Sequence, residues 1–245
     1  MNIISRILLI FLIISFGFAC EESSIEPTAS DASLRIMAIG DSRVAGLHPE
    51  FESYRYELWK NLLVNEWDVD FLGTRLDEGN YPSFQDKTFD KEHEGIGGAT
   101  TLSTLEQVRE LSESLNPNLI LLGIGGNDFE DTQRSSEEMI QTMEEIISGL
   151  RDKYNNPDFI VERIAPGRSD FMIANARNRE RFNSFNSLLP DLAIRMSNSD
   201  SQIWLVDNTQ GWTDNLFADQ VHYNAAGAKL VADRYYAEIV EHVSR

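Results

Sequence analysis

A serine near the start of this sequence and a histidine near its end stand in settings that suit a nucleophile and its base. Ser42 follows closely on the apolar run at residues 34–39, and His222 stands three residues after Asp219. A serine hydroxyl becomes an effective nucleophile when an imidazole takes its proton, and a carboxylate beside that imidazole fixes its tautomer and stabilises its charged form. Ser42, His222 and Asp219 are therefore candidates for the catalytic groups of a serine hydrolase.

Such a reaction also needs hydrogen-bond donors for the oxyanion, and the loss of one donor typically lowers turnover about 10²–10³-fold. Two glycine-rich segments, HEGIGGAT at residues 93–100 and GIGGND at residues 123–128, provide candidates. The Ser42 amide, a glycine amide and the Asn127 side chain are the donors that we expect. Glycine suits this position because a side chain would block the approach of the oxyanion.

Five short apolar runs predict the strands that would position these groups. They occupy residues 34–39, 69–72, 118–124, 158–164 and 202–206. Strands that alternate with helices favour a parallel sheet covered on both faces. We therefore predict an α/β fold, a three-layer α/β/α sandwich with a mainly parallel five-stranded sheet, flavodoxin-like, over residues 34–245. Ligands of such sheets bind just beyond the carboxyl ends of the strands, where Ser42 and Asn127 fall.

Helices between the strands are predicted from apolar residues that recur every three or four positions. The stripes are Phe51, Tyr54, Leu58 and Leu62; Leu102, Leu105, Val108 and Leu111; Met139, Met143, Ile146 and Leu150; Phe182, Phe185, Leu188 and Leu192; and Val231, Tyr235, Ile239 and Val243. Pro190 is expected to kink or split its helix. Asn224 is a plausible N-cap for the last one.

The composition narrows the classes of function. The 245 residues include 42% hydrophobic residues, enough apolar material for a full core, and 40 acidic against 21 basic residues, for a net charge of −19. Such a charge repels phosphate backbones, so nucleic-acid binding is disfavoured. A neutral or cationic partner fits better, although excess acid can also serve only as solubilising surface.

The N-terminal segment predicts export. Arg6 precedes an almost wholly apolar run that ends in FGFAC, at the only cysteine of the chain, Cys20. This pattern has the form of a secretory signal peptide over residues 1–19, and it resembles the lipobox of bacterial lipoproteins, in which the cysteine is lipidated. Residues 20–33 would then be the lipidated Cys20 and a flexible tether, and the protein an exported, membrane-anchored lipoprotein of the periplasm or cell surface. Gly17 and Ala19 would also suit an ordinary signal peptidase, which is the alternative.

Four short motifs together resemble the SGNH hydrolases, also called the GDSL esterase/lipase superfamily. In family order they are Gly40-Asp41-Ser42, Gly98, Gly125-Gly126-Asn127-Asp128 and Asp219-Gln220-Val221-His222. The resemblance implies Ser42 as nucleophile, His222 as base and Asp219 as its orienting acid. It implies an oxyanion hole of Ser42, Gly98 and Asn127, and it implies no cofactor. Arg43 departs from the pattern, because a small apolar residue usually follows the serine.

A narrower resemblance concerns the carbohydrate-esterase branch that includes acetyl xylan esterases. The segments YRYELWKNLL, DVDFLGT and DKEHEGIGGAT carry it, whereas Ala99 stands where an aromatic residue often follows the oxyanion glycine. This likeness implies a serine esterase that removes O-acyl groups from carbohydrate through an acyl-enzyme intermediate, with acetyl as the expected acyl group. A lysophospholipase or thioesterase is the alternative within the superfamily, and a non-catalytic surface binding lipoprotein is the alternative outside it.

Other polar residues have structural interpretations. Asp41 and Asp128 are expected to brace loops rather than to react. His93 and Glu94 suggest a metal, but His48 and His242 bring no matching spacing, so no metal is expected. The segment GIGGND lacks the third glycine of a dinucleotide fingerprint and follows the third predicted strand rather than the first.

Overall fold

The computed structural model describes residues 29–130 and 134–244. The predicted signal peptide, Cys20 and most of the predicted tether lie outside the described residues. Ser30 is already bound to the domain, because its amide donates to Asn116 Oδ1 at 2.9 Å and Asn116 Nδ2 donates to its carbonyl at 2.8 Å. In residues 29–130 and 134–244, no helix is both long enough and apolar enough to cross a membrane.

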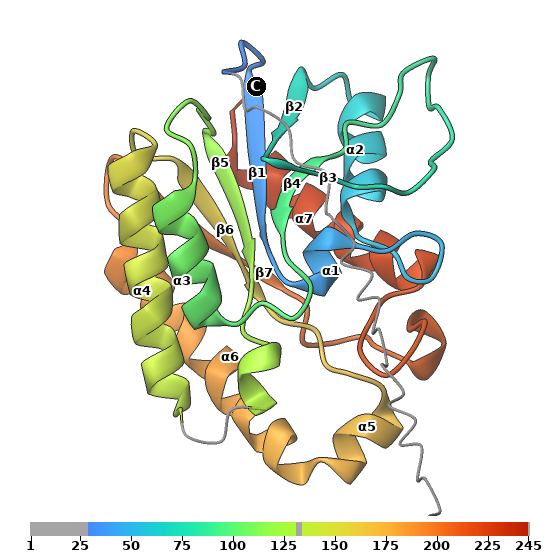
Figure 1. The fold of residues 1–245 in the computed structure, drawn as a ribbon, viewed down its shortest axis with the longest axis vertical. Helices are drawn as coiled ribbons and strands as arrows, with labels where there is room; N and C mark the ends of the chain where they lie inside the picture. The colour runs from blue at the N-terminus through green and yellow to red at the C-terminus, as the bar shows by residue number, and fades with distance from the viewer. Residues whose placement is uncertain (1–28, 131–133, 245) are drawn as a thin grey trace, which may run out of the picture.

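Among the described residues, seven strands form one mainly parallel sheet, which confirms the predicted α/β sandwich (Figure 1). They are β1 (Leu34–Gly40), β2 (Val69–Leu72), β3 (Arg75–Leu76), β4 (Glu92–Gly95), β5 (Leu119–Gly123), β6 (Asp158–Arg163) and β7 (Ile203–Asp207). Their order is β3-β4-β1-β5-β6-β7, with β2 paired to β1 beside β4. β3 and β4 form the antiparallel pair.

The prediction of five strands was too low by two. β3 has only two residues, and β4 has the sequence Glu-His-Glu-Gly, which carries no apolar side chain. Its pairing with β1 and β3 makes it a strand, and an apolar pattern cannot reveal that.

Helices cover both faces of the sheet. They are α1 (Ser42–Ala45), α2 (Arg55–Val64), α3 (Thr101–Glu110), α4 (Ser136–Lys153), α5 (Ser169–Ala174), α6 (Ala176–Met196) and α7 (Ala225–His242), with the 3-10 turns η1 (Asn127–Glu130) and η2 (Asp214–Leu216). Alternate residues of β1 divide the core: Ile36 and Ala38 pack with α2 and α7, whereas Met37 and Ile39 pack with α3, α4 and α6. Figure 1 shows the two helical layers on opposite sides of the strands.

Asn224 and Pro190 show how single residues affect the start and the continuity of helices. Asn224 caps α7 as predicted, since its side chain accepts from the amides at positions 226 and 227. α6 continues through Pro190 instead of splitting there. Proline leaves the carbonyl four residues earlier without a helical donor, and Arg163 Nε donates to that carbonyl, of Asn186, at 3.3 Å.

The prediction that Phe51 belongs to the helix of the first apolar stripe was wrong. α2 begins at Arg55, and Phe51 lies before it in an isolated bridge with Leu47.

Arg55 is a fully buried cation that holds α1 in place. Its Nε donates to the Val44 carbonyl and its Nη2 to the Ala45 carbonyl, each at 2.8 Å. Nη2 also pairs with Asp77 Oδ2 at 2.8 Å, and Tyr81 donates its hydroxyl hydrogen to the same oxygen. The carboxylate thus neutralises the charge that binds the helix carbonyls.

We predict that Asp77→Asn lowers the free energy of unfolding by about 3 kcal/mol, because it leaves the Arg55 charge buried without a counter-ion. Urea denaturation measures the effect. The matched control is Asp233→Asn, which removes the exposed pair with Lys229 and should cost less than about 1 kcal/mol. Equal losses in the two variants would contradict a special role for the buried pair.

Candidate active site

Ser42 and His222 are 180 positions apart in the sequence and meet at the carboxyl edge of the sheet. Ser42 is the first residue of α1, directly beyond β1, and His222 lies in the loop before α7. His222 Nε2 is 2.8 Å from Ser42 Oγ, and His222 Nδ1 is 2.6 Å from Asp219 Oδ2. The structure therefore joins the three residues that the sequence proposed in one chain of hydrogen bonds.

Asp219 shapes the loop that carries the histidine. Its Oδ1 accepts from the backbone amides of Val221 and His222 at 2.8 Å each, while Oδ2 faces the His222 ring. Partial burial acts to raise the pKa of Asp219, but the hydrogen bonds from the His222 ring and the two amides outweigh it and hold this pKa below its ordinary value. The carboxylate stays ionised and can orient the imidazole.

Asp41 holds the helix that begins at the next residue, Ser42. Its Oδ1 accepts from the Arg43 amide at 2.9 Å, which caps α1. Burial raises the pKa of Asp41, although the Arg43 guanidinium acts in the opposite direction. These contacts agree with the structural role expected for Asp41.

The three predicted oxyanion donors are not equally placed. Ser42 and Asn127 line the same cavity, whereas Gly98 is not among the residues that line it. Asn127 Nδ2 donates to the Ala99 carbonyl at 2.9 Å, so it ties the loop after β5 to the Gly98 segment. Gly98 has a φ of +75°, which favours glycine, and no atom lies within 4 Å of where a Cβ would stand.

Asp128 braces this region as expected. It accepts from the Thr101 amide at 2.8 Å and from the Thr101 hydroxyl at 2.6 Å, and it pairs with Arg134 at 2.9 Å. Burial raises the pKa of Asp128. Its carboxylate joins the loop after β5 to the start of α3.

Phe51 is a site residue that sequence reasoning missed. Its ring stacks on His222, with centroids 3.9 Å apart and an interplanar angle of 16°. The stacked ring limits rotation of the imidazole away from Ser42. No local signal marks this role, because Phe51 fits an apolar helical stripe equally well.

Arg43 links α1 to the histidine loop. Its Nε donates to the Val221 carbonyl at 2.9 Å, and its Nη1 and Nη2 donate to the carbonyls of Ala165 and Pro166 at 2.7 and 3.0 Å. Its guanidinium also lies 5.0 Å from the centroid of the Tyr223 ring. The departure from the family pattern thus has a structural explanation: one side chain joins three segments of the site.

His93 and Glu94 belong to β4 rather than to a metal site. His93 Nδ1 accepts from the Gly95 amide at 3.0 Å, and burial lowers the pKa of His93 to about 2. Glu94 accepts from the Thr74 amide and the Gln107 side chain. Within the described part of the chain, no three His, Cys, Asp or Glu side chains are grouped to hold a metal ion.

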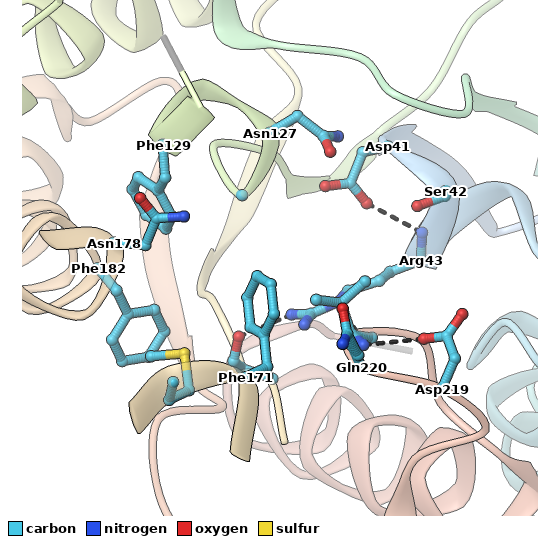
Figure 2. Close-up of a pocket in the computed structure, with 15 residues that line it drawn as sticks. Asp41, Ser42, Arg43, Asn127, Phe129, Phe171, Asn178, Phe182, Asp219 and Gln220 are labelled. Atoms are coloured by element: carbon cyan, nitrogen blue, oxygen red, sulfur yellow. Dashed lines mark hydrogen bonds between the residues drawn. The ribbon is translucent and has the colours of Figure 1, made fainter. Parts of the chain in front are cut away.

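A cavity of about 390 Å³ opens beside Ser42. Figure 2 shows Asp41, Ser42 and Arg43 on one side of it and Phe129 and Phe182 on the other. A serine hydroxyl that is hydrogen-bonded to a histidine, which is itself paired with a carboxylate, is the arrangement typical of hydrolases of the acyl-transfer class, and here it lies beside such a cavity.

Comparison with known proteins agrees with this class. Residues 38–230 match the GDSL-like lipase/acylhydrolase family. The chain belongs to that family and is a hydrolase that acts on ester bonds. No curated protein sequence matches it.

Solved structures share its fold at low sequence identity. A family 3 carbohydrate esterase from Talaromyces cellulolyticus has 19% identity and a TM-score of 0.72, over 85% of this chain and 97% of its own. A family 3 carbohydrate esterase from Clostridium thermocellum has 22% identity and a TM-score of 0.68, over 85% and 96%. An acetyl xylan esterase has 16% identity and a TM-score of 0.60, over 84% and 100%.

We predict that Arg43→Met lowers both the melting temperature and esterase turnover, turnover by about tenfold or more. The substitution leaves three carbonyls without their donor, and each lost bond to a charged group costs about 1.5–3 kcal/mol. Arg43→Lys should have a melting temperature and a turnover between those of Arg43→Met and the wild-type protein, because an ammonium group cannot bind three carbonyls in the plane of a guanidinium.

Thermal denaturation and p-nitrophenyl acetate hydrolysis measure the two effects. The control is Arg109→Met at an exposed position of α3. Wild-type values in Arg43→Met would show that these bonds do not position the site.

Proposed function

We propose that the protein is a serine esterase that removes O-acyl groups, acetyl among them, from carbohydrate through an acyl-enzyme. The observation that carries this proposal is the hydrogen-bonded chain from Asp219 through His222 to Ser42 Oγ. The match of residues 38–230 to the acylhydrolase family supports the same chemistry.

In the first half of the reaction, His222 Nε2 takes the proton of Ser42 as Oγ attacks the ester carbonyl carbon. The tetrahedral intermediate collapses when the bond to the alcohol oxygen breaks and His222 returns the proton to that oxygen. In the second half, His222 takes a proton from water as the water oxygen attacks the carbonyl carbon of the acyl-enzyme. The bond between that carbon and Ser42 Oγ then breaks, and His222 returns the proton to Oγ as the acid leaves. Asp219 keeps the ring in the tautomer that places the lone pair toward Ser42.

The proposed oxyanion hole consists of the backbone amides of Ser42 and Gly98 and the side chain of Asn127. The Ser42 amide is the first of α1 and has no acceptor within that helix. The Asn127 amide group has two N–H bonds, of which one is used by Ala99. The second remains to stabilise a developing negative charge.

Carbohydrate as the substrate is supported by the carbohydrate esterases that share the fold. The net charge of −19 also suits a neutral polymer better than an anionic lipid surface. A non-catalytic binding module would not need the arrangement of Ser42, His222 and Asp219. An acyl group larger than acetyl is favoured by one observation, the cavity beside Ser42.

We predict that Ser42→Ala lowers kcat for p-nitrophenyl acetate by about 10⁴–10⁶-fold without a change in the circular dichroism spectrum. Acetate release from a panel of acetylated polysaccharides, with Ser42→Ala as the blank, identifies the carbohydrate. Ser148→Ala, on the exposed face of α4, should retain full turnover. Hydrolysis that survives in Ser42→Ala would remove the nucleophile from the proposal.

We also propose that the protein is exported and anchored through a lipid on Cys20. The support is the sequence alone: a basic start, an apolar run and a single cysteine at its end.

Metabolic labelling with palmitate tests the anchor. We expect label in the wild-type protein and none in Cys20→Ser. An exported wild-type protein that carries no label would favour ordinary signal-peptidase cleavage and contradict the anchor.

A further inference from the structure

The end of the cavity away from Ser42 is lined mostly by aromatic side chains, with the polar Asn178 beside Phe129. Phe129 from η1, Phe171 from α5 and Phe182 from α6 line it (Figure 2). Met172 from α5 is a further lining residue. Phe129 and Phe182 are each more than nine-tenths buried, and their rings meet edge to face with centroids 6.4 Å apart. Packed aromatic side chains form a firm wall, whose shape a ligand has to match.

The position of His222 indicates which half of an ester enters this cavity. The leaving alcohol oxygen takes its proton from His222 Nε2, so the alcohol lies toward His222 and the stacked Phe51. Neither of these residues lines the cavity, whereas Ser42 and the oxyanion candidate Asn127 do, and Asp219, Gln220 and Val221 of the histidine loop line it as well. Because the rest of the wall comes from η1, α5 and α6 and not from Phe51 or the His222 ring, the geometry assigns the cavity to the acyl side of the scissile bond.

The size of the cavity exceeds what acetyl requires. A water molecule has roughly 30 Å³ of liquid volume, and a methylene group is of similar size. The three heavy atoms of an acetyl group thus fill about 90 Å³ of the 390 Å³ present. An acyl group with several more carbons can bury its methylenes here, and each buried methylene improves binding about threefold to fourfold.

The polar groups of the cavity disfavour a charged acyl group. Asp41 and Asp219 line the end near Ser42 and would repel a carboxylate. The Arg43 guanidinium, which also lines that end, already donates to three carbonyl oxygens. A neutral hydrocarbon chain fits the aromatic end better than an acidic one does.

The length of the chain is limited at the far end. Met172 and Phe182 line both this cavity and a neighbouring one of about 310 Å³, so they form the partition between the two. α5, which carries Met172, is fixed by Ser169, whose amide and hydroxyl donate to Asp214 at 2.7 and 2.6 Å. The partition sets an upper limit on acyl length.

We propose that this cavity is an acyl pocket for neutral linear acyl groups of about four to eight carbon atoms, built by α5 and α6 on the acyl side of Ser42. The proposal rests on the proposed esterase function and extends it from acetyl to longer acyl esters. It assigns a specificity role to Phe171, Met172 and Asn178, which lie outside the motifs found in the sequence.

The test is the kcat/KM of the wild-type protein for p-nitrophenyl acetate, butanoate, hexanoate, octanoate and dodecanoate. We expect a rise of at least about tenfold from acetate to hexanoate and a fall at dodecanoate. A steady fall from acetate onward would overturn the acyl pocket and leave the esterase proposal standing. Absence of hydrolysis of every ester would instead defeat the proposed function itself.

A matched pair of variants locates the effect. Asn178 lines the cavity from α6, and Glu180 is exposed on the same helix outside it. Asn178→Phe should lower the ratio of hexanoate to acetate kcat/KM by about tenfold or more, because the new ring occupies the chain's space. Glu180→Phe should leave that ratio unchanged, and equal ratios in the two variants would overturn the proposal.

A second series of substrates tests which half of the ester enters the cavity. Ethyl acetate and hexyl acetate differ only in the alcohol, and Asn178→Phe should not change their ratio. A change in this ratio, with the acyl series unaffected, would show that the cavity receives the alcohol and would overturn the assignment.

Discussion

The arrangement of the site depends on how a helix of only four residues is held in place. α1 carries Ser42, and a helix of this length has too few internal hydrogen bonds to be stable by itself. Arg55 binds its last carbonyls from one side, and Arg43 extends from it to the Val221 carbonyl on the other. A guanidinium presents five donors in a rigid plane, so one side chain can fix several carbonyls in a defined geometry.

This use of arginine requires buried charge in a strongly acidic protein. Arg55 is neutralised by Asp77, and Arg43 lies near Asp41 and the buried Glu162, which raise its pKa against the effect of burial. A buried cation without such partners would be costly. The interior therefore keeps a few acids beside its arginines, while the rest of the acidic excess is left to the surface.

The proposed catalytic groups and the proposed acyl pocket come from different parts of the fold. Ser42 and Asn127 stand at the carboxyl ends of neighbouring strands, where the parallel ladder fixes their spacing. The cavity wall comes from α5 and α6, which follow β6 and rest on loop contacts such as Ser169 with Asp214. Changes in these segments would leave the sheet intact, so the proposed acyl pocket can differ without loss of the proposed reaction.

The sequence by itself determined the features that depend on near neighbours. Apolar runs marked five of the seven strands, Asn224 marked the start of α7, and the three-residue spacing placed Asp219 within reach of His222. Order along the chain also proposed Ser42 as the partner of His222, but only the tertiary structure placed the two 2.8 Å apart. The strand β4, the stacked Phe51, the bonds of Arg43 and the cavity of α5 and α6 were decided by the tertiary structure, because each arises from contacts between distant segments that leave no local pattern.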